Sequence, residues 1–243
     1  MRGALQVSGH FGEWLQGRLG PAGPVALITL PCAALGVRAA HWPGGALHLY
    51  RAGAPGRARA LLARLGLPAR GRFLLRPLAA PGLGTGVSTA SLIAIARLAG
   101  WQGPPEDLAR VCVAVEGASD PLMFPTPERM LWASRAGVVL APMPALPRYE
   151  VLGGFYGPPR RTDPADARFP DIADLVADWR RAASLPAFAA LARESAARTL
   201  ALRGPAGDPS AALAREIGAL GFLIAHTGAA RGFVFAPGTV PEG

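Results

Sequence analysis

The chain has 243 residues, 51% of them hydrophobic, which is enough to bury the core of one large domain or two small lobes. No apolar run reaches the roughly 18 residues of a membrane span, and no basic-then-apolar secretory signal opens the chain, so we expect a cytoplasmic protein with no membrane contact. The formal charge is +9, but all 25 basic residues are scattered arginines. This pattern does not favour nucleic-acid binding, although its field would attract a small polyanion such as a nucleotide.

The first hundred residues alternate strands and turns before a helix begins. Short β-like runs occupy the segments ALQVSG, PVALITLPC, ALGVRAAHW and ALHLY, with glycine and proline turns between them. A helical spacing follows over 57–65, and an apolar strand over 72–78 leads directly into the stretch PGLGTGVSTA. Helices are then predicted over 88–98, stopped by Gly100, and from Pro105 onward in PEDLARVCVAVEG.

The chain between the two halves is less regular. After Glu116 we predict an irregular segment, GASDPLMFPTPERM, followed by a short strand, AGVVLAP. A proline-rich turn over 143–147 suggests a lobe boundary. We therefore expect an N-terminal lobe of residues 1–145 and a C-terminal α+β lobe of residues 146–243.

The C-terminal half is predicted to contain mainly helices between strands. A strand in YEVLGGFYG and a polar connection, GPPRRTDPADARFP, precede helices over 171–183, 186–200 and 210–220. Asp208 and Ser210 are candidate caps of the last helix. Two apolar strands close the chain around the turn AHTGAARG. This mixture of strands and helices predicts an α+β fold of two lobes.

The stretch PGLGTGVSTA is the first candidate for a binding site. Its glycines, at positions 82, 84 and 86, permit close backbone approach, and the following helix directs unpaired N–H groups and its positive dipole end at that point. The lysine of a Walker loop is missing, and a plain strand-to-helix turn is the alternative interpretation. Hydroxyl groups that suit phosphate oxygens or Mg²⁺ come from Thr85, Ser88 and Thr89.

Two other segments carry polar groups among glycines, and together the three resemble a known family. SGHFGEWLQG contains His10, Glu13 and Gln16, and AHTGAARG contains His226 and Thr227. Motifs at the start, middle and end of the chain resemble the layout of the GHMP kinases, the galacto-, homoserine, mevalonate and phosphomevalonate kinases. The resemblance implies a two-lobed α+β fold with the active site in the cleft between the lobes, and an ATP-dependent kinase that phosphorylates an alcohol.

The central motif of that family is similar to this glycine loop. Three glycines of the family pattern fall on the glycines here, and its magnesium-binding serine falls on Ser88, whereas Val87 replaces a preceding serine. The resemblance implies ATP and Mg²⁺ as cofactors, with Ser88 as a metal ligand that also acts in catalysis. It implies ATP contacts by Pro81, Gly82, Leu83, Gly84, Thr85, Gly86, Val87, Ser88 and Thr89.

Within the superfamily, the sequence most resembles the L-threonine kinases of cobalamin biosynthesis. GEWLQG, VSTA and AHTG are similar to three motifs of that branch. The branch implies transfer of phosphate to L-threonine, giving O-phospho-L-threonine for the cobalamin side chain. It implies acceptor contacts by Glu13, Gln16, His226 and Thr227. The alternatives are the same chemistry on another small alcohol such as homoserine, or a non-catalytic basic protein that binds nucleotide or RNA.

Four other polar residues have two interpretations each. The resemblance implies that Glu116 binds the metal and that Asp120 is a catalytic base, but a surface charge and a turn residue are the structural alternatives. His10 is interpreted as a turn histidine with its hydrogen bonds satisfied. Arg231 would contact a phosphate or the carboxylate of the acceptor, or else be solvated.

Overall fold

The structure is a computed structural model that describes residues 3–51 and 54–242, and over these residues it contains one nine-stranded sheet. The strands are β1 (Gly3–Arg18), β2 (Val25–Trp42), β3 (Leu47–Tyr50), β4 (Gly71–Pro77), β5 (Met130–Ala133), β6 (Val138–Pro142), β7 (Glu150–Phe155), β8 (Gly221–Ile224) and β9 (Ala230–Phe235). Their order is β3-β4-β2-β1-β8-β9-β7, with β5 paired to β2 and β6 paired to β5. All pairs are antiparallel except β3 with β4.

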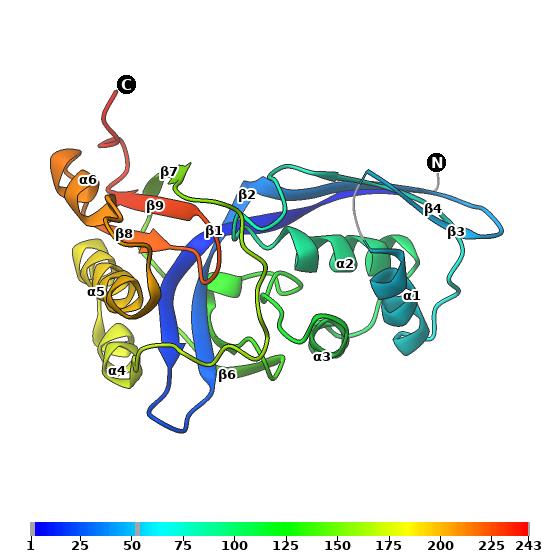
Figure 1. Ribbon diagram of the computed structural model, residues 1–243, viewed down its shortest axis with the longest axis horizontal. Coiled ribbons are helices and arrows are strands. Elements are labelled where there is room, and N and C mark those ends of the chain that lie inside the picture. Colours follow the sequence, from blue (N-terminus) through cyan, green and yellow to red (C-terminus); the bar gives the residue numbers. More distant parts are fainter. Residues whose placement is uncertain (1–2, 52–53, 243) are drawn as a thin grey trace.

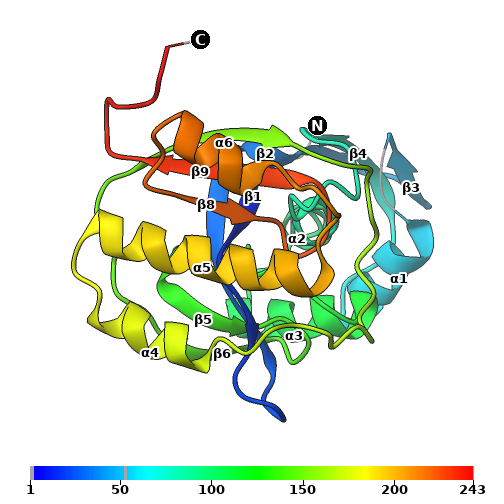
Figure 2. The same ribbon diagram turned by 60° about the vertical axis from the view of Figure 1, so that its left-hand side comes forward.

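The helices form two groups around this sheet (Figure 1). They are α1 (Pro55–Arg64), α2 (Val87–Leu98), α3 (Pro105–Glu116), α4 (Ala173–Arg181), α5 (Leu185–Arg203) and α6 (Ser210–Glu216). Helices α1, α2 and α3 contact one another at one end of the molecule, and α4 and α5 pack together at the other (Figures 1 and 2). Among the described residues, no helix is both long and apolar enough to cross a bilayer.

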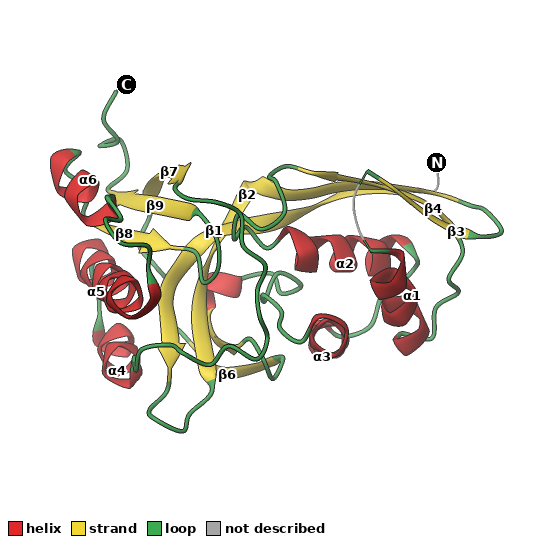
Figure 3. Ribbon diagram, in the orientation of Figure 1, coloured by secondary structure: helices red, strands yellow, loops and turns green. Residues whose placement is uncertain are grey.

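Secondary structure of both kinds runs through the whole molecule (Figure 3), so the α+β prediction is confirmed. The predicted order of strand, glycine loop and helix is present as β4, the loop and α2. Strand β5 was missed: only Met130 lies in the segment expected to be irregular, and the next three residues were assigned to no element. All four of its residues are buried, with Leu131 and Trp132 in different core clusters. A strand buried on both faces lacks the polar alternation by which a strand is recognised in a sequence.

The long hairpin of β1 and β2 contributes to two hydrophobic core clusters. One cluster lies against α1, α2 and α3 and includes Val7 and Ile93. The other includes Trp14, which packs against Trp179 of α4 and lies in the same cluster as Phe188 of α5. Residues on both sides of position 145 therefore share the second cluster, and the lobe boundary stays a prediction.

The register of the hairpin shifts where the two clusters meet. Irregularities fall between Ser8 and Gly9, between His10 and Glu13, and between Glu13 and Leu15. Bulges of this kind break the alternation of side chains and redirect them. Two buried polar side chains, His10 and Glu13, lie beside these irregularities.

Arg231 is buried and not solvated, which contradicts one of its two sequence interpretations. Its guanidinium pairs with Asp208 at 2.7 Å, and both side chains are less than 10% exposed. Burial would raise the pKa of Asp208, but the hydrogen bonds from Arg231 and Ser210 hold it below its ordinary value. Asp208 also accepts from the Ser210 backbone N–H at 3.0 Å, whereas Ser210 is the first helical residue and provides no side-chain cap.

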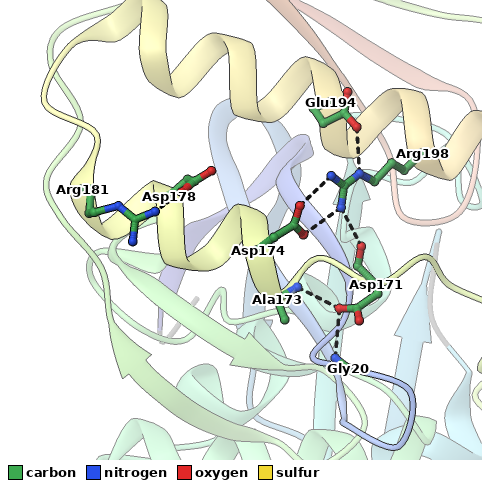
Figure 4. A network of polar contacts seen from close by, with 8 residues as sticks. All are labelled: Gly20, Asp171, Ala173, Asp174, Asp178, Arg181, Glu194 and Arg198. Carbon is green, nitrogen blue, oxygen red and sulfur yellow. Dashed lines mark hydrogen bonds and ion pairs between the residues drawn. The ribbon is translucent and has the colours of Figure 1, made fainter.

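A second polar network joins the turn after β1 to α4 and α5 (Figure 4). Arg198 donates to both carboxylate oxygens of Asp174, at 2.8 and 2.7 Å, and to Glu194 at 2.8 Å. It also donates to the carbonyl of Asp171, whose carboxylate accepts from the Gly20 backbone N–H at 3.0 Å. Because most of these groups are exposed, water screens the ion pairs, and their main effect is to fix how the turn and the two helices meet.

Candidate active site

The glycine-rich loop ends at the first turn of α2, as the sequence predicts. Gly86 is the residue before the helix and has a φ of 69°, and Gly84 has a φ of 79°. These left-handed conformations strain residues that carry a Cβ, which explains the glycines. No side chain caps the helix, so its first N–H groups remain available to an anion.

All three sequence motifs meet at this loop. The carbonyl of Leu83 accepts hydrogen bonds from the N–H groups of Ala229 and Ala230, both at 3.0 Å. The carbonyl of Thr85 accepts from the His10 N–H at 3.2 Å. Segments more than 200 residues apart in the sequence therefore share one backbone hydrogen-bonded surface.

The close packing of Gly84 gives a testable prediction. An alanine Cβ there would lie 2.1 Å from the Thr227 carbonyl oxygen and 2.4 Å from the Ala225 Cβ. We expect Gly84→Ala to reduce the free energy of unfolding by about 3 kcal/mol, measured by urea denaturation. Gly66 is a matched control, because it also has positive φ but open space around it, and alanine there should cost only about 1 kcal/mol. Equal losses in the two variants would contradict the close contact with the C-terminal turn.

A cavity of about 570 Å³ lies beside the loop and collects most of the predicted site residues. Its lining includes residues from both sides of position 145. The predicted residues that line it are Pro81, Gly82, Gly84, Thr85, Gly86, Val87, Ser88, Thr89, Glu116, Asp120, His226 and Thr227. The predicted residues outside the lining are Leu83, Glu13 and Gln16, and of these Leu83 contacts the C-terminal turn through its backbone.

Two oxygen-bearing side chains meet at the start of α2. The Ser88 hydroxyl donates a short hydrogen bond to Glu116 at the end of α3, and Thr89 donates to the other carboxylate oxygen at 3.4 Å. Arg57 Nη1 lies 3.0 Å from Glu116 Oε1 and 3.3 Å from Ser88 Oγ, so one cationic nitrogen already shares these two oxygens. Burial raises the pKa of Glu116, which the hydrogen bond from Ser88 and the charge of Arg57 partly offset. The cluster thus provides the hard oxygen donors that suit Mg²⁺.

A histidine between two carboxylates lies on the same cavity. His10 Nε2 is 3.5 Å from Asp120 Oδ2, and Nδ1 is 3.4 Å from Glu13 Oε1. Burial would lower the pKa of His10, but Asp120 and Glu13 raise it to about 9. Burial raises the pKa of Glu13 to about 8 despite the nearby imidazole. The proton shared by His10 and Glu13 belongs either to Nδ1 or to the Glu13 carboxyl. In both cases Nε2, which faces Asp120, keeps its own proton near neutral pH.

The three ligand atoms of this cluster also lie within 4.8 Å of one another, which is close enough to hold a metal ion. His10 was interpreted from the sequence as a turn histidine, and that interpretation was wrong: it is a strand residue that lines the cavity. Its contacts depend on the bulges of β1, which no local pattern in the sequence reveals.

Gln16 lies behind the site rather than in it. Its side-chain amide donates to the carbonyl of Ile224 at 2.9 Å, and its backbone N–H donates to the Ser195 hydroxyl at 2.9 Å. The residue is completely buried. Gln16 therefore joins β1 to β8, which leads directly into the turn that carries His226.

His226 forms a layered contact with Phe169 and two arginines. Its ring stacks on Phe169 with centroids 4.3 Å apart and planes 5° apart, and the Arg203 guanidinium lies 4.1 Å from the Phe169 centroid. Nε2 of His226 lies 2.8 Å from Arg135 Nη1. Burial and the charges of Arg135 and Arg203 lower the pKa of His226 well below its ordinary value. The imidazole is therefore neutral and accepts a hydrogen bond from Arg135. No sequence pattern had marked Arg135 as a site residue.

Comparisons with known proteins agree with the fold. No protein-family model and no curated protein sequence matches the chain. Among solved structures, it is similar to a mevalonate kinase from Methanococcus jannaschii, with a TM-score of 0.68 at 10% identity over 97% of this chain and 91% of that one. A phosphomevalonate kinase from Streptococcus pneumoniae gives 0.63 at 12% over 98% and 93%, and a putative homoserine kinase from Listeria monocytogenes gives 0.58 at 15% over 96% and 86%.

These similarities extend over nearly the full length of each chain. The protein therefore has the α+β fold of the GHMP kinases, as the sequence motifs implied.

Proposed function

We propose that the protein is an ATP- and Mg²⁺-dependent kinase of the GHMP type that phosphorylates the hydroxyl group of L-threonine. The observation that carries the proposal is the arrangement of the cavity. An uncapped helix N-terminus, the Ser88–Glu116 oxygen pair and the Asp120 carboxylate all border the same space. Phosphoryl transfer needs these three elements together, because it depends on positioning and on stabilising negative charge.

The loop over 81–89 would hold the phosphates of ATP. The first turn of α2 lines the cavity and has no side-chain cap, and Arg57 adds a positive charge with almost half of its side chain exposed. Ser88 and Glu116 would hold the metal, and their shared contact with a guanidinium nitrogen supports this assignment. When bound there, Mg²⁺ would neutralise charge on the phosphate oxygens.

Asp120 would take the proton of the acceptor hydroxyl. It lines the cavity with its carboxylate directed at His10 Nε2. The raised pKa of His10 keeps its imidazole protonated near neutral pH, and the contact with Nε2 fixes the position of the Asp120 carboxylate. Glu13 would act through His10 in this arrangement.

The acceptor is assigned from the motifs around the cavity. GEWLQG and AHTG are similar to the motifs of L-threonine kinases, and Gln16 of the first motif donates a hydrogen bond to the carbonyl of Ile224, which directly precedes the second. His226 and Thr227 border the space directly. Gln16 would support the second motif from behind through Ile224.

An acceptor screen tests the proposal. The protein is incubated with Mg-ATP and, separately, L-threonine, L-serine, L-homoserine or no acceptor, while ADP release is measured. We expect L-threonine to give the largest stimulation, with O-phospho-L-threonine as the product. A larger response to L-homoserine would move the assignment to that acceptor, and no response to any hydroxyl amino acid would overturn it. RNA binding that weakens steeply with salt, without ATP turnover, would support the nucleic-acid alternative instead.

A further inference from the structure

Arg135 is a half-buried cation whose hydrogen-bond partners among the described residues are all neutral. It follows β5 and lines the cavity together with Asp120. Its nitrogens contact the Ser134 hydroxyl at 2.8 Å, the His226 ring at 2.8 Å and the Asp166 carbonyl at 3.4 Å. Within the described part of the chain, its Nε is buried without a hydrogen-bond partner. By contrast, a carboxylate pairs with each of the comparable arginines Arg198, Arg203 and Arg231.

The surroundings hold the Arg135 guanidinium in place. His226 accepts its hydrogen bond and is itself fixed by stacking on Phe169. Arg203 covers Phe169 and is held by Asp166 at 2.6 Å. A guanidinium fixed in this way loses little conformational freedom when it binds a planar anion such as a carboxylate.

The charge of Arg135 is incompletely balanced. Burial lowers its pKa, and the charges of Asp120 and Asp166 offset this only in part. A desolvated cation that faces a cavity without a paired carboxylate is stabilised by an anionic ligand. The position of Arg135 thus calls for negative charge from the molecule that occupies the cavity.

The position of Arg135 indicates whether ATP or the acceptor supplies the negative charge that this arginine would bind. Arg135 Nη1 lies 2.8 Å from His226 Nε2, whereas Arg57 Nη1 lies 3.0 Å from Glu116 Oε1. The phosphate end of the cavity therefore has its own cation. Arg135 lies at the end that contains the proposed base and His226, where the acceptor would bind.

We infer that Arg135 binds a carboxylate on the acceptor, so that the site selects hydroxy amino acids over amino alcohols that lack the carboxylate. This inference rests on the proposed kinase function for the identity of the acceptor, but the binding of a carboxylate can be measured without turnover. His226 is then a positioning residue that orients the guanidinium. Recognition of this kind uses two parallel N–H donors, which lysine does not provide.

The test compares acceptors with and without their carboxylate. L-Threonine is paired with 1-aminopropan-2-ol, and L-homoserine with 3-aminopropan-1-ol, and calorimetry measures binding in the presence of Mg²⁺ and a non-hydrolysable ATP analogue. For at least one of the two pairs, we expect the unaltered protein to bind the amino acid about 30-fold more tightly than the corresponding amino alcohol. Arg135→Met should reduce that preference to about threefold or less, leaving the amino alcohol unaffected.

Two further variants complete the test. Arg135→Lys keeps the cation and should retain part of the preference, and it gives an answer if the methionine variant does not fold. Arg110→Met removes an exposed arginine of α3 that lies outside the cavity, and it should keep the full preference. Equal weakening of acid and alcohol by Arg135→Met, or no preference in the unaltered protein, would overturn the inference. A carboxylate preference without any acceptor-dependent ADP release would support the subsite and contradict the kinase function.

Discussion

Replacing Asp120 with asparagine is expected to reduce kcat by about 10²–10⁴-fold, the usual contribution of a general base. The amide has nearly the same shape as the carboxylate but cannot accept the proton of the hydroxyl group. ATP binding should change little, because the loop over 81–89 and the Ser88–Glu116 pair remain intact. Steady-state kinetics at saturating Mg-ATP measure the effect. Asp107→Asn, on the exposed surface of α3, is the control for the loss of one negative charge.

The same variant should also alter His10 in a way that does not depend on turnover. Asp120 raises the pKa of His10 both by its charge and by its hydrogen bond, while burial lowers it. With the carboxylate gone, the pKa should fall from about 9 toward or below the ordinary value of 6.5, as measured by NMR titration of the imidazole. An unchanged histidine pKa would show that the two side chains do not interact, and an unchanged kcat would show that Asp120 is not the base.

The parts of the site that the sequence predicts are those fixed by local geometry. The backbone at position 86 has a positive φ, which favours glycine there. The helix after it begins where the hydrophobic periodicity starts. Ser88 is placed by its position in the first turn of that helix, and Glu116 by its position at the end of the next. Each of these signals spans only a few residues, so a sequence pattern can carry it.

The parts that the sequence does not predict depend on contacts between distant elements. His10 faces Asp120 only because β1 changes register twice between residues 8 and 13. Gln16 was expected to contact the acceptor, but it lies outside the cavity because its side chain is used between β1 and β8. A one-residue change in strand register reverses the direction of every side chain, and no local pattern records where it happens.

The arginines were the hardest residues to assign from the sequence. All 25 basic residues are arginines, so residue type alone does not distinguish Arg57 or Arg135 from the other arginines. What distinguishes them is their partners: Arg57 contacts the oxygens at α2, Arg135 contacts only neutral groups, and Arg231 pairs with Asp208. Partners are properties of the tertiary structure, which is why the sequence did not reveal the pairing of Arg231 with Asp208.

Removing the Ser88 hydroxyl is expected to raise the concentration of Mg²⁺ needed for half-maximal activity by at least about 10-fold, as losing support of a metal site commonly does. The hydroxyl contacts Glu116 and faces the cavity, so its loss leaves one oxygen donor where two were present. Activity is measured over a range of Mg²⁺ at fixed ATP, with circular dichroism to confirm folding. Ser91→Ala is a matched control in the same helix, because that hydroxyl donates to the Val87 carbonyl at 2.7 Å.

A double-mutant cycle decides whether Ser88 and Glu116 act on one ion. If they share a ligand, Glu116→Gln alone should already remove most of the metal affinity, and adding Ser88→Ala should cost much less than it does in the unaltered protein. Independent roles would instead give additive effects on the Mg²⁺ requirement. Glu116→Gln also removes the negative charge that Arg57 contacts at 3.0 Å, so this variant changes the surroundings of Arg57 as well as the metal site. Additive effects would therefore show that Ser88 and Glu116 influence the Mg²⁺ requirement independently rather than through one shared ion.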